Sequence, residues 1–258
     1  MKAAPDPDRI YERALREGRR RIGMSTLQQV ATGFIAGVTI IFGIVALGVT
    51  RSLLEPDLGP GAAEVGGALA FGLGLVFLVV GRSELFTENF FDPVAVAIEE
   101  RNRRTWVRLL GLWVTILALN LVGGAVLVAV LTIEGALSEG TNAALVSVAD
   151  EIVSKEWSAT LARAVLAGTL ITLLSYMLHA VNSVSARILV AYLVGAFLAL
   201  GPFDHVVVSA LHVLFGIWLS GDIGYAELAA NISLATAGNL AGGLILMTLT
   251  HTAQVKSR

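Results

Sequence analysis

The sequence predicts an all-α integral membrane protein with six transmembrane helices, arranged as two inverted three-helix repeats whose second and fifth helices are broken. Three observations predict this fold class. The 258-residue chain is 55% apolar and only 15% charged, with a mean hydropathy of +0.77, which is too apolar for a soluble domain. Six apolar segments have the length that a bilayer requires. Two polar interruptions lie in corresponding spans of the two halves.

Residues 1–26 form a basic segment ahead of the first span. It contains six arginines, and Ile10, Ala14 and Ile22 fall roughly on one side of a helix, which predicts a short helix at the membrane interface. A nucleic-acid-binding arm is the alternative interpretation. We expect a cytoplasmic flank, because apolar spans of bilayer length follow directly.

The apolar segments define the remaining boundaries. The predicted spans are residues 27–50, 64–82 with a continuation to 98, 106–132, 158–181, 187–217 and 227–251. The first repeat is therefore 27–132 and the second is 158–251. An acidic extracytoplasmic loop at 133–157 separates them, and a cytoplasmic tail follows at 252–258.

Two pairs of landmarks indicate an internal repeat. Asn120-Leu-Val-Gly-Gly recurs as Asn239-Leu-Ala-Gly-Gly (239 − 120 = 119), and Thr87 and His205 follow the two breaks at nearly the same separation (205 − 87 = 118). Because each half has three spans, an odd number, the halves must lie in opposite orientations. The breaks are Gly81-Arg82-Ser83-Glu84 and Gly201-Pro202-Phe203-Asp204-His205.

The distribution of basic residues predicts that both ends of the chain are cytoplasmic. With the N-terminus inside, fourteen Lys and Arg residues fall on the inner side, and only Arg51 and Lys155 fall outside. Arg82 and Arg163 remain within spans. The inner residues are Lys2, Arg9, Arg13, Arg16, Arg19, Arg20, Arg21, Arg101, Arg103, Arg104, Arg108, Arg187, Lys256 and Arg258.

The second break is the expected centre of a transport path. Its Gly-Pro pair ends a helix, and Asp204 and His205 follow at once. At membrane depth such groups are tolerated only beside protein or a water-filled cavity. Thr87 and Asp204 are expected to cap two half-helices whose N-termini attract an anion. Asn120 and Asn239 are expected as interhelical hydrogen-bond partners, with substrate contact as the alternative.

Energetics favour a neutral permeant over a bare anion. Burying an ion at low dielectric costs on the order of 20 kcal/mol. Protonating a carboxylate with a pKa near 4 at pH 7 costs about 4 kcal/mol. An imidazole that titrates near neutrality suits this proton exchange, so we expect protonation near His205. Whether His205 donates the proton or only shapes the surroundings stays open.

Four stretches together resemble the formate/nitrite transporter family. They are Phe71-Gly-Leu-Gly-Leu75 running on to Glu84-Leu85-Phe86-Thr87, then Gly201 to His205, the two Asn-Leu-x-Gly-Gly sites, and Arg163-Ala-Val-Leu-Ala-Gly168. The resemblance implies an aquaporin-like protomer in a bacterial cytoplasmic membrane, with five protomers in a ring and a pore in each. It implies passage of formate, nitrite or hydrosulfide with their conjugate acids.

The resemblance also assigns roles to residues. His205 would be the central pore histidine, with Asp204 as its acidic neighbour and Thr87 as its partner, and Lys155 would stand at the outer vestibule. The implied constriction residues are Phe71, Leu75, Leu85, Phe86 and Leu198. The departures from the family pattern are Gly168, where the family usually has Asn, and Arg82 and Glu88 beside the first break. They leave the substrate open.

The remaining ionisable residues in the spans are expected to be structural. His179, His212 and His251 suit packing or interface positions. Arg82 is expected to pair with Glu84 or Glu88, or else to line the pore. Arg163 is expected to reach the outer surface as a structural residue.

No motif indicates an enzyme, a cofactor or a metal site, and the absence of cysteine excludes disulfides and thiolate ligands. The expected partners are a small monovalent anion, protons and the lipid bilayer, without nucleic acid. Three alternatives stay open. They are a hydrolase using Asp204, His205 and Ser209, a neutral-solute or water channel, and a scaffold without transport. The channel alternative lacks the Asn-Pro-Ala signature at the breaks.

Overall fold

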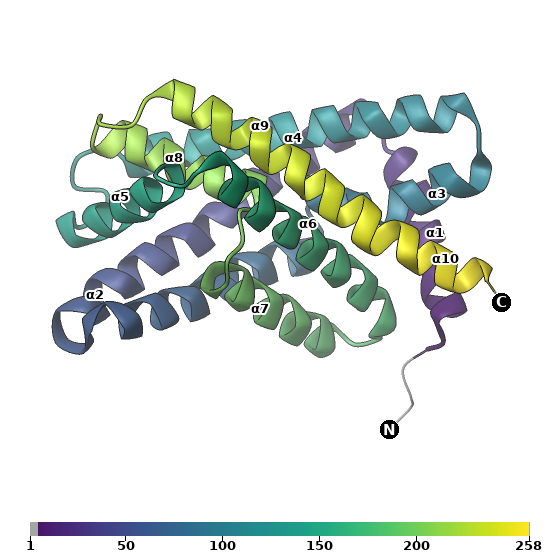
Figure 1. Cartoon of the computed structure of the whole chain (residues 1–258), viewed down its shortest axis with the longest axis horizontal. Coiled ribbons are helices and arrows are strands. Elements are labelled where there is room, and N and C mark those ends of the chain that lie inside the picture. Colours follow the sequence, from purple (N-terminus) through teal and green to yellow (C-terminus); the bar gives the residue numbers. More distant parts are fainter. Residues whose placement is uncertain (1–4, 258) are drawn as a thin grey trace.

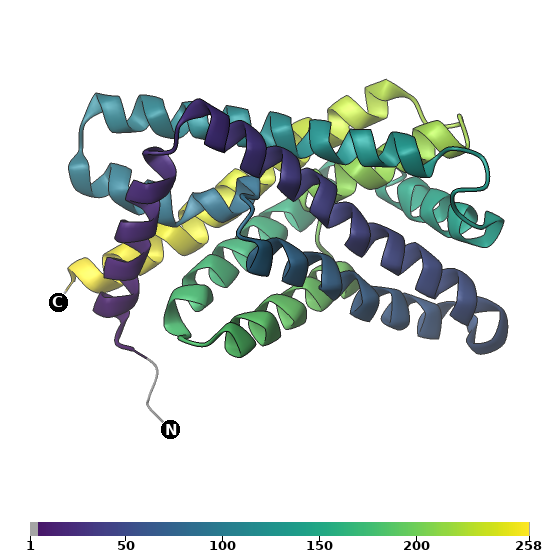
Figure 2. The same ribbon diagram turned by 180° about the vertical axis from the view of Figure 1, so that it is seen from behind.

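The computed structural model describes residues 5–257, and every regular element in that part of the chain is helical (Figures 1 and 2). Lys2 and Arg258 lie outside the described residues. The helices are α1 (Pro7–Ile22), α2 (Thr26–Gly81), η1 (Phe86–Phe90), α3 (Asp92–Glu100), α4 (Arg103–Leu131), α5 (Glu139–Val153), α6 (Trp157–Ala180), α7 (Val184–Leu200), α8 (Val206–Leu219), α9 (Tyr225–Ala241), η2 (Gly242–Leu249) and α10 (Thr250–Lys256). The predicted all-α fold is confirmed.

Helix α2 consists of two arms joined by a sharp bend. Its 56 residues would extend about 84 Å if straight, far more than the ~30 Å hydrocarbon core of a bilayer. Gly59, between Pro56 and Pro60, has φ 78° and ψ 172°, a conformation that favours glycine. Figure 1 shows the chain folding back on itself there. The first two predicted spans are therefore the two arms of α2.

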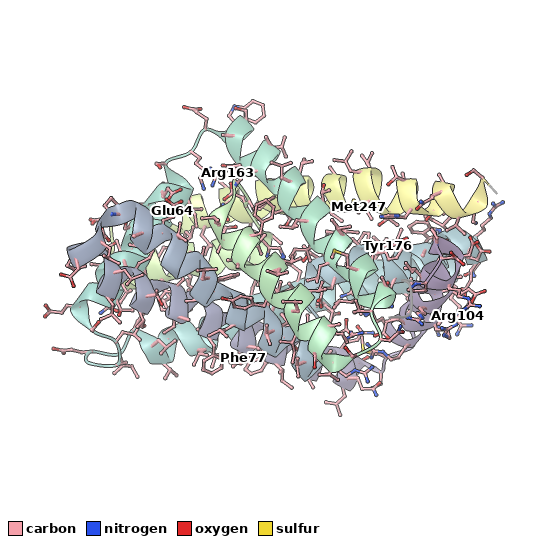
Figure 3. All side chains as sticks on the ribbon, turned by 90° about the horizontal axis from the view of Figure 1, so that it is seen from below. Glu64, Phe77, Arg104, Arg163, Tyr176 and Met247 are labelled. Atoms are coloured by element: carbon pink, nitrogen blue, oxygen red, sulfur yellow. The ribbon has the colours of Figure 1, made fainter. Side chains whose placement is uncertain are left out.

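Within residues 5–257, four helical stretches are long and apolar enough to cross a membrane. They are α2, α4, α6 and the continuous stretch Tyr225–Lys256, while α7 and α8 are shorter apolar helices. Many large apolar side chains on these helices are exposed, including Phe77 on the outer surface in Figure 3. An exposed apolar surface of this kind suits contact with lipid or with other protomers.

Both predicted breaks are present. Helix α2 ends at Gly81, and the chain becomes helical again only at Phe86. Helix α7 ends at Leu200, and α8 begins at Val206. The two breaks therefore interrupt the second and fifth predicted spans.

The expected caps of the half-helices were wrong. The N-cap of η1 is Leu85 and that of α8 is His205, rather than Thr87 and Asp204. In the second break the N–H of Asp204 donates to the carbonyl of Arg163, so Asp204 stays in the extended connection and the helix begins after His205.

The N-terminal helix packs on the protein and does not lie alone at a membrane surface. Tyr11 and Ala14 of α1 form a buried cluster with Phe91 and Ala95. The apolar side predicted from the sequence is real, but its partner is the segment after the first break. Figure 1 shows α1, α3 and α10 at one end of the molecule.

The segment 133–157, predicted as a loop, contains helix α5. Ser138 caps this helix by accepting a hydrogen bond from the backbone N–H of Thr141. Ala149 and Ile152 pack against Val213 of α8. Helix α5 and the bend of α2 form the end of the molecule opposite α1 (Figure 1).

Candidate functional site

The two breaks meet at Thr87 and His205. Thr87 Oγ1 and His205 Nε2 are 2.6 Å apart, and the two residues are 0% and 2% exposed. His205 Nδ1 accepts a hydrogen bond of 3.4 Å from the N–H of Val208, so the neutral ring carries its proton on Nε2 and donates it to Thr87. The Thr87 hydroxyl is then able to donate its own proton to a bound molecule.

A buried asparagine fixes the backbone of the first break. Asn120 Oδ1 accepts a 2.9 Å hydrogen bond from the N–H of Phe86. Its Nδ2 donates to the carbonyls of Glu84, at 3.0 Å, and Gly33, at 2.9 Å. The Asn120 amide therefore makes one accepted and two donated hydrogen bonds, all with backbone groups.

Asn239 fixes the second break in the same way. Its Oδ1 accepts from the N–H of Val206 at 3.0 Å, and its Nδ2 donates to the carbonyls of Asp204, at 3.0 Å, and Ala164, at 2.8 Å. Neither asparagine lines the cavities described below. The geometry matches the interhelical interpretation and not substrate contact.

These bonds set the correspondence between the breaks. Val206 corresponds to Phe86 (206 − 86 = 120), and Asp204 corresponds to Glu84 (204 − 84 = 120). His205 therefore matches Leu85 and not Thr87.

The Lys155 cavity, of about 380 Å³, reaches His205 from the α5 end. Lys155 Nζ lies 3.1 Å from Asp204 Oδ1, and Arg163 Nε lies 3.5 Å from Asp204 Oδ2. Asp204 is 2% exposed, so two cations compensate its buried charge. Arg163, expected as structural, thus also lines this cavity. Its ionisable lining residues are Arg51, Glu64, Glu151, Lys155, Arg163, Asp204, His205 and His212.

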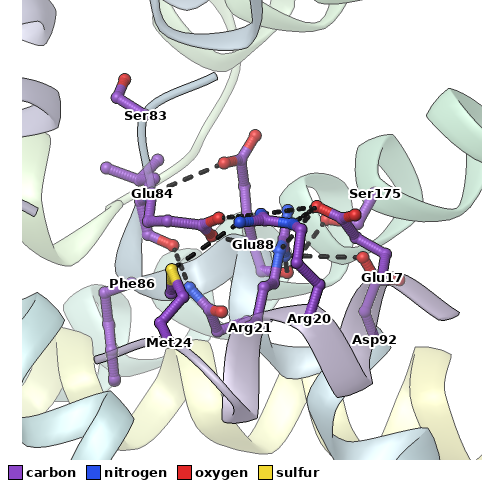
Figure 4. Close-up of polar contacts among 12 residues, drawn as sticks. Glu17, Arg20, Arg21, Met24, Ser83, Glu84, Phe86, Glu88, Asp92 and Ser175 are labelled. Atoms are coloured by element: carbon purple, nitrogen blue, oxygen red, sulfur yellow. Dashed lines mark hydrogen bonds and ion pairs between the residues drawn. The ribbon is translucent and has the colours of Figure 1, made fainter. Parts of the chain in front are cut away.

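The Arg21 cavity, of about 560 Å³, lies at the α1 end, where the dashed contacts of Figure 4 converge on Arg20 and Arg21. Arg20 Nη2 donates to Glu84 Oε1, and Arg21 Nε lies 3.1 Å from Glu84 Oε2. Arg21 Nη1 lies 3.5 Å from Asp92 Oδ2, whose other oxygen is 2.8 Å from His179 Nε2. The N-terminal helix therefore supplies cations to a buried acidic site.

The expected pairing of Arg82 with Glu84 or Glu88 was wrong. Arg82 lines the Arg21 cavity, but within residues 5–257 it has no ion pair shorter than 4 Å, because Arg20 and Arg21 occupy Glu84. A sequence signal existed, since Arg13, Glu17 and Arg21 are four residues apart and share one helix face. It did not identify the partner.

The contacts of this cavity change the pKa values of Glu17 and Arg21 in α1. Burial alone would raise the pKa of Glu17, but the hydrogen bond from Arg20 and the charges of Arg21 and Arg20 lower it to about 2. Burial opposes the charge of Arg21, yet the carboxylates of Glu84 and Asp92 raise its pKa. Both groups therefore stay charged across the physiological range.

A run of apolar side chains on the second arm of α2, called the apolar barrier below, joins the linings of the two cavities. Phe71, Leu75 and Val79 are four residues apart and share one face of the second arm of α2. Phe71 and Leu198 line the Lys155 cavity, Val79 lines the Arg21 cavity, and the buried Leu75 lies between Phe71 and Val79 on the helix. The eight residue-to-residue steps from Phe71 to Val79 span about 12 Å.

The other two expected constriction residues lie at the first break. Leu85 is buried as the N-cap of η1. Phe86 packs edge-on against Phe90 and Trp113, so its ring belongs to an aromatic cluster. Neither residue lines the two cavities.

The remaining histidines differ in surroundings. His179 pairs with Asp92, His212 lines the Lys155 cavity and contacts the carbonyl of Val208 at 3.0 Å, and His251 stacks on Tyr176. His251 is therefore held by ring packing and by a 3.3 Å contact between its Nδ1 and Gln254 Oε1. Within residues 5–257, no group of three or more acidic, His or Cys side chains is placed to hold a metal ion.

The sequence profile described as "Formate/nitrite transporter" matches residues 8–253. The chain belongs to the formate/nitrite transporter family. The expectation of a transporter, and not an enzyme, is thereby confirmed.

Named relatives cover most of this transporter. "Inner membrane protein YfdC" of Escherichia coli is 24% identical over 249 residues, covering 96% of this chain and 78% of the relative. The "Probable formate transporter" of Methanothermobacter thermautotrophicus is 28% identical, covering 84% and 85%. "Formate channel FocA" of Escherichia coli is 24% identical, covering 86% and 83%.

Solved structures share the fold. A pentameric formate channel with formate bound superposes with a TM-score of 0.78 at 19% identity, over 90% of this chain and 98% of that one. An FNT family ion channel gives 0.79 at 18% identity, over 94% and 97%. The chain thus has the fold of these channels.

Proposed function

We propose that this protein lets small monovalent anions, such as formate, nitrite or hydrosulfide, cross a bilayer as neutral weak acids. The observation that carries the proposal is the Thr87–His205 hydrogen bond, which lies at the inner end of a cation-bearing cavity next to the barrier residue Phe71. Family membership and the relatives named as formate channels support this substrate class.

Attraction of the anion is the first step. Arg51, Lys155 and Arg163 line the Lys155 cavity and offset the charges of Glu64, Glu151 and Asp204, so the cavity presents no net negative charge to an entering anion. Helix α8 begins at Val206 with His205 as its N-cap, so the positive end of its dipole faces the same place. The anion therefore accumulates beside the hydrogen-bonded pair.

Proton transfer is the second step. A proton taken up at His205 Nδ1 displaces the contact with the N–H of Val208 and yields an imidazolium. This imidazolium passes its Nε2 proton to Thr87, whose hydroxyl proton moves to the anion, leaving neutral imidazole and the neutral acid. The neutral acid avoids the cost of carrying a charge past Phe71 and Leu75.

The architecture extends the proposal. The matching asparagine contacts at the two breaks support two related halves, and an odd number of spans in each makes them inverted, as in an aquaporin-like protomer. The pentameric formate channel of the same fold supports a ring of five protomers. The named location of one relative supports the bacterial inner membrane, with both chain ends cytoplasmic.

Flux into proteoliposomes tests the proposal. Formate, nitrite, hydrosulfide, glycerol and water are compared by stopped flow at two external pH values. We expect faster anion uptake at the lower pH, and its loss in His205→Ala. His251→Ala is the matched control, because His251 lines neither cavity. Unchanged flux and pH dependence in His205→Ala, or water and glycerol flux without anion flux, would contradict the proposal.

A further inference from the structure

We infer that Glu88 is a second proton-exchanging group, serving the Arg21 cavity as His205 serves the Lys155 cavity. Glu88 lies in η1 directly after Thr87, lines the Arg21 cavity and is 4% exposed. An ionisable side chain at this depth in a membrane protein indicates function. Its part in flux rests on the proposed function, whereas its protonation does not.

The correspondence of the two breaks relates the backbone contact of Glu88 to the one that His205 makes. His205 corresponds to Leu85 (205 − 85 = 120), and Val208 corresponds to Glu88 (208 − 88 = 120). In the second break His205 Nδ1 accepts from the N–H of Val208, and in the first break Glu88 Oε2 accepts from the N–H of Leu85, at 3.5 Å. Each break thus contains one titratable side chain that accepts a hydrogen bond from a backbone N–H three residues away in the same break.

The cations around Glu88 are engaged elsewhere. Arg21 Nη1 donates to the backbone carbonyl of Glu88 at 2.7 Å, while Arg21 Nε and Arg20 face Glu84. The Asp92 carboxylate contacts both Arg21 Nη1 and His179 Nε2. In the described part of the chain, no Lys, Arg or His nitrogen lies within 4 Å of the Glu88 carboxylate. The other charged groups on this cavity are Arg13, Arg16, Glu17, Arg82 and Arg187.

A buried carboxylate with one long hydrogen bond and no cation in contact is stabilised by gaining a proton. The neighbouring carboxylates Glu84 and Asp92 favour the neutral form, and the more distant charge of Arg21 favours the ionised form. These opposing influences suit a group that gains and loses a proton during transport.

The exchange balances in both directions. A neutral acid that has crossed the barrier loses its O–H or S–H proton to a Glu88 carboxylate oxygen, leaving an anion in a cavity that holds six arginines. The proton then passes from Glu88 to water in that cavity. In the reverse direction, protonated Glu88 returns its proton to an entering anion.

Infrared titration of the protein in lipid tests the protonation directly. We expect a carboxylic-acid C=O band at neutral pH that shifts in D₂O and is lost in Glu88→Gln. The Gln oxygen can still accept from the N–H of Leu85, so the break is preserved. Glu99→Gln is the matched control and should retain the band, since the Glu99 carboxylate is exposed and pairs with Lys256. Absence of a Glu88-dependent band would overturn the inference.

Flux with the pH varied only on the α1 side tests the role in transport. We expect Glu88→Gln to lose the dependence on that pH while keeping the dependence on pH at the opposite side. Glu99→Gln, on the exposed side of α3, should behave as wild type. Unchanged dependence in Glu88→Gln would overturn the transport role. Absence of anion flux in the wild type would instead count against the proposed function, and the infrared band would still decide the protonation.

Discussion

Buried carboxylates at the two breaks are compensated by cations from other elements. Asp204 faces Lys155 and Arg163, and Glu84 faces Arg20 and Arg21. A buried charge is strongly destabilising when its partner is removed, because the remaining charge is left at low dielectric. The cations thus stabilise the protein as well as attracting anions.

Replacing Lys155 by Met should lower the stability of the protein by about 2 kcal/mol, because Asp204 keeps only the longer contact to Arg163. The measurement is thermal unfolding of the solubilised protein in a double-mutant cycle with Asp204→Asn. We expect the double variant to recover part of the loss, since no buried charge then remains unpaired. Additivity of the two substitutions within about 0.5 kcal/mol would show that the pair is not coupled.

At the level of elements, the breaks depend on buried amides. Asn120→Leu and Asn239→Leu each leave one backbone N–H and two carbonyls without their partner. Each unsatisfied group costs about 1–3 kcal/mol, so both variants should unfold at clearly lower temperatures. Asn142→Leu is the matched control, because the Asn142 amide oxygen has no hydrogen-bond partner. Equal melting temperatures for all three variants would contradict this role.

Helix α1 itself should become less stable in acid, because Glu17, Arg20 and Arg21 all lie within it. The folded-state pKa of Glu17 is about 2, below its ordinary value of 4.5, so the stabilisation from its contacts with Arg20 and Arg21 is present above pH 4.5. It is lost as the pH falls from 4.5 through 2. Hydrogen exchange of the α1 amides, corrected for intrinsic rates, should accelerate over this window in wild type. Glu17→Gln should exchange faster at neutral pH and change less, and identical profiles would refute the assignment.

The elements differ in how far sequence predicts them. The breaks are marked locally, by Gly201-Pro202 and by polar residues after Gly81, and their positions were correct. The contacts of α1 are not local, because Arg20 and Glu84 are 64 residues apart, and nothing in either segment identifies the other. Helix α5 was missed because it is short and lies in an acidic segment. Thr87 contacts His205 where the breaks meet, and Asp204 directly precedes His205, but neither is an N-cap, because cap geometry depends on φ and ψ that residue type alone does not determine.

The role of Gly168 is likewise visible in the structure and not in the sequence. From sequence it is only a departure from the family pattern. In the structure, a Cβ at this position would overlap the backbone carbonyl of Asn239, so helices α6 and α9 approach too closely for a side chain. Gly37 makes the equivalent approach to the carbonyl of Asn120. The glycine therefore serves the contact that fixes the second break.

The whole molecule is polarised along its long axis. Arg104 lies at the α1 end in Figure 3, and Glu64 and Arg163 lie in the other half of the molecule. Basic residues cluster at the α1 end, which the positive-inside rule assigns to the cytoplasm. Single-cysteine labelling suits a test, because the chain has no native cysteine.

Ser154→Cys, in the turn after α5, and Asn182→Cys, between α6 and α7, place exposed thiols at opposite ends. A membrane-impermeant maleimide should label Ser154→Cys on intact cells, and Asn182→Cys only after permeabilisation. The reverse pattern would contradict the orientation and put the Lys155 cavity in the cytoplasm. Anions entering from outside would then meet the Arg21 cavity first, and the order of proton exchange would begin at Glu88 instead of His205.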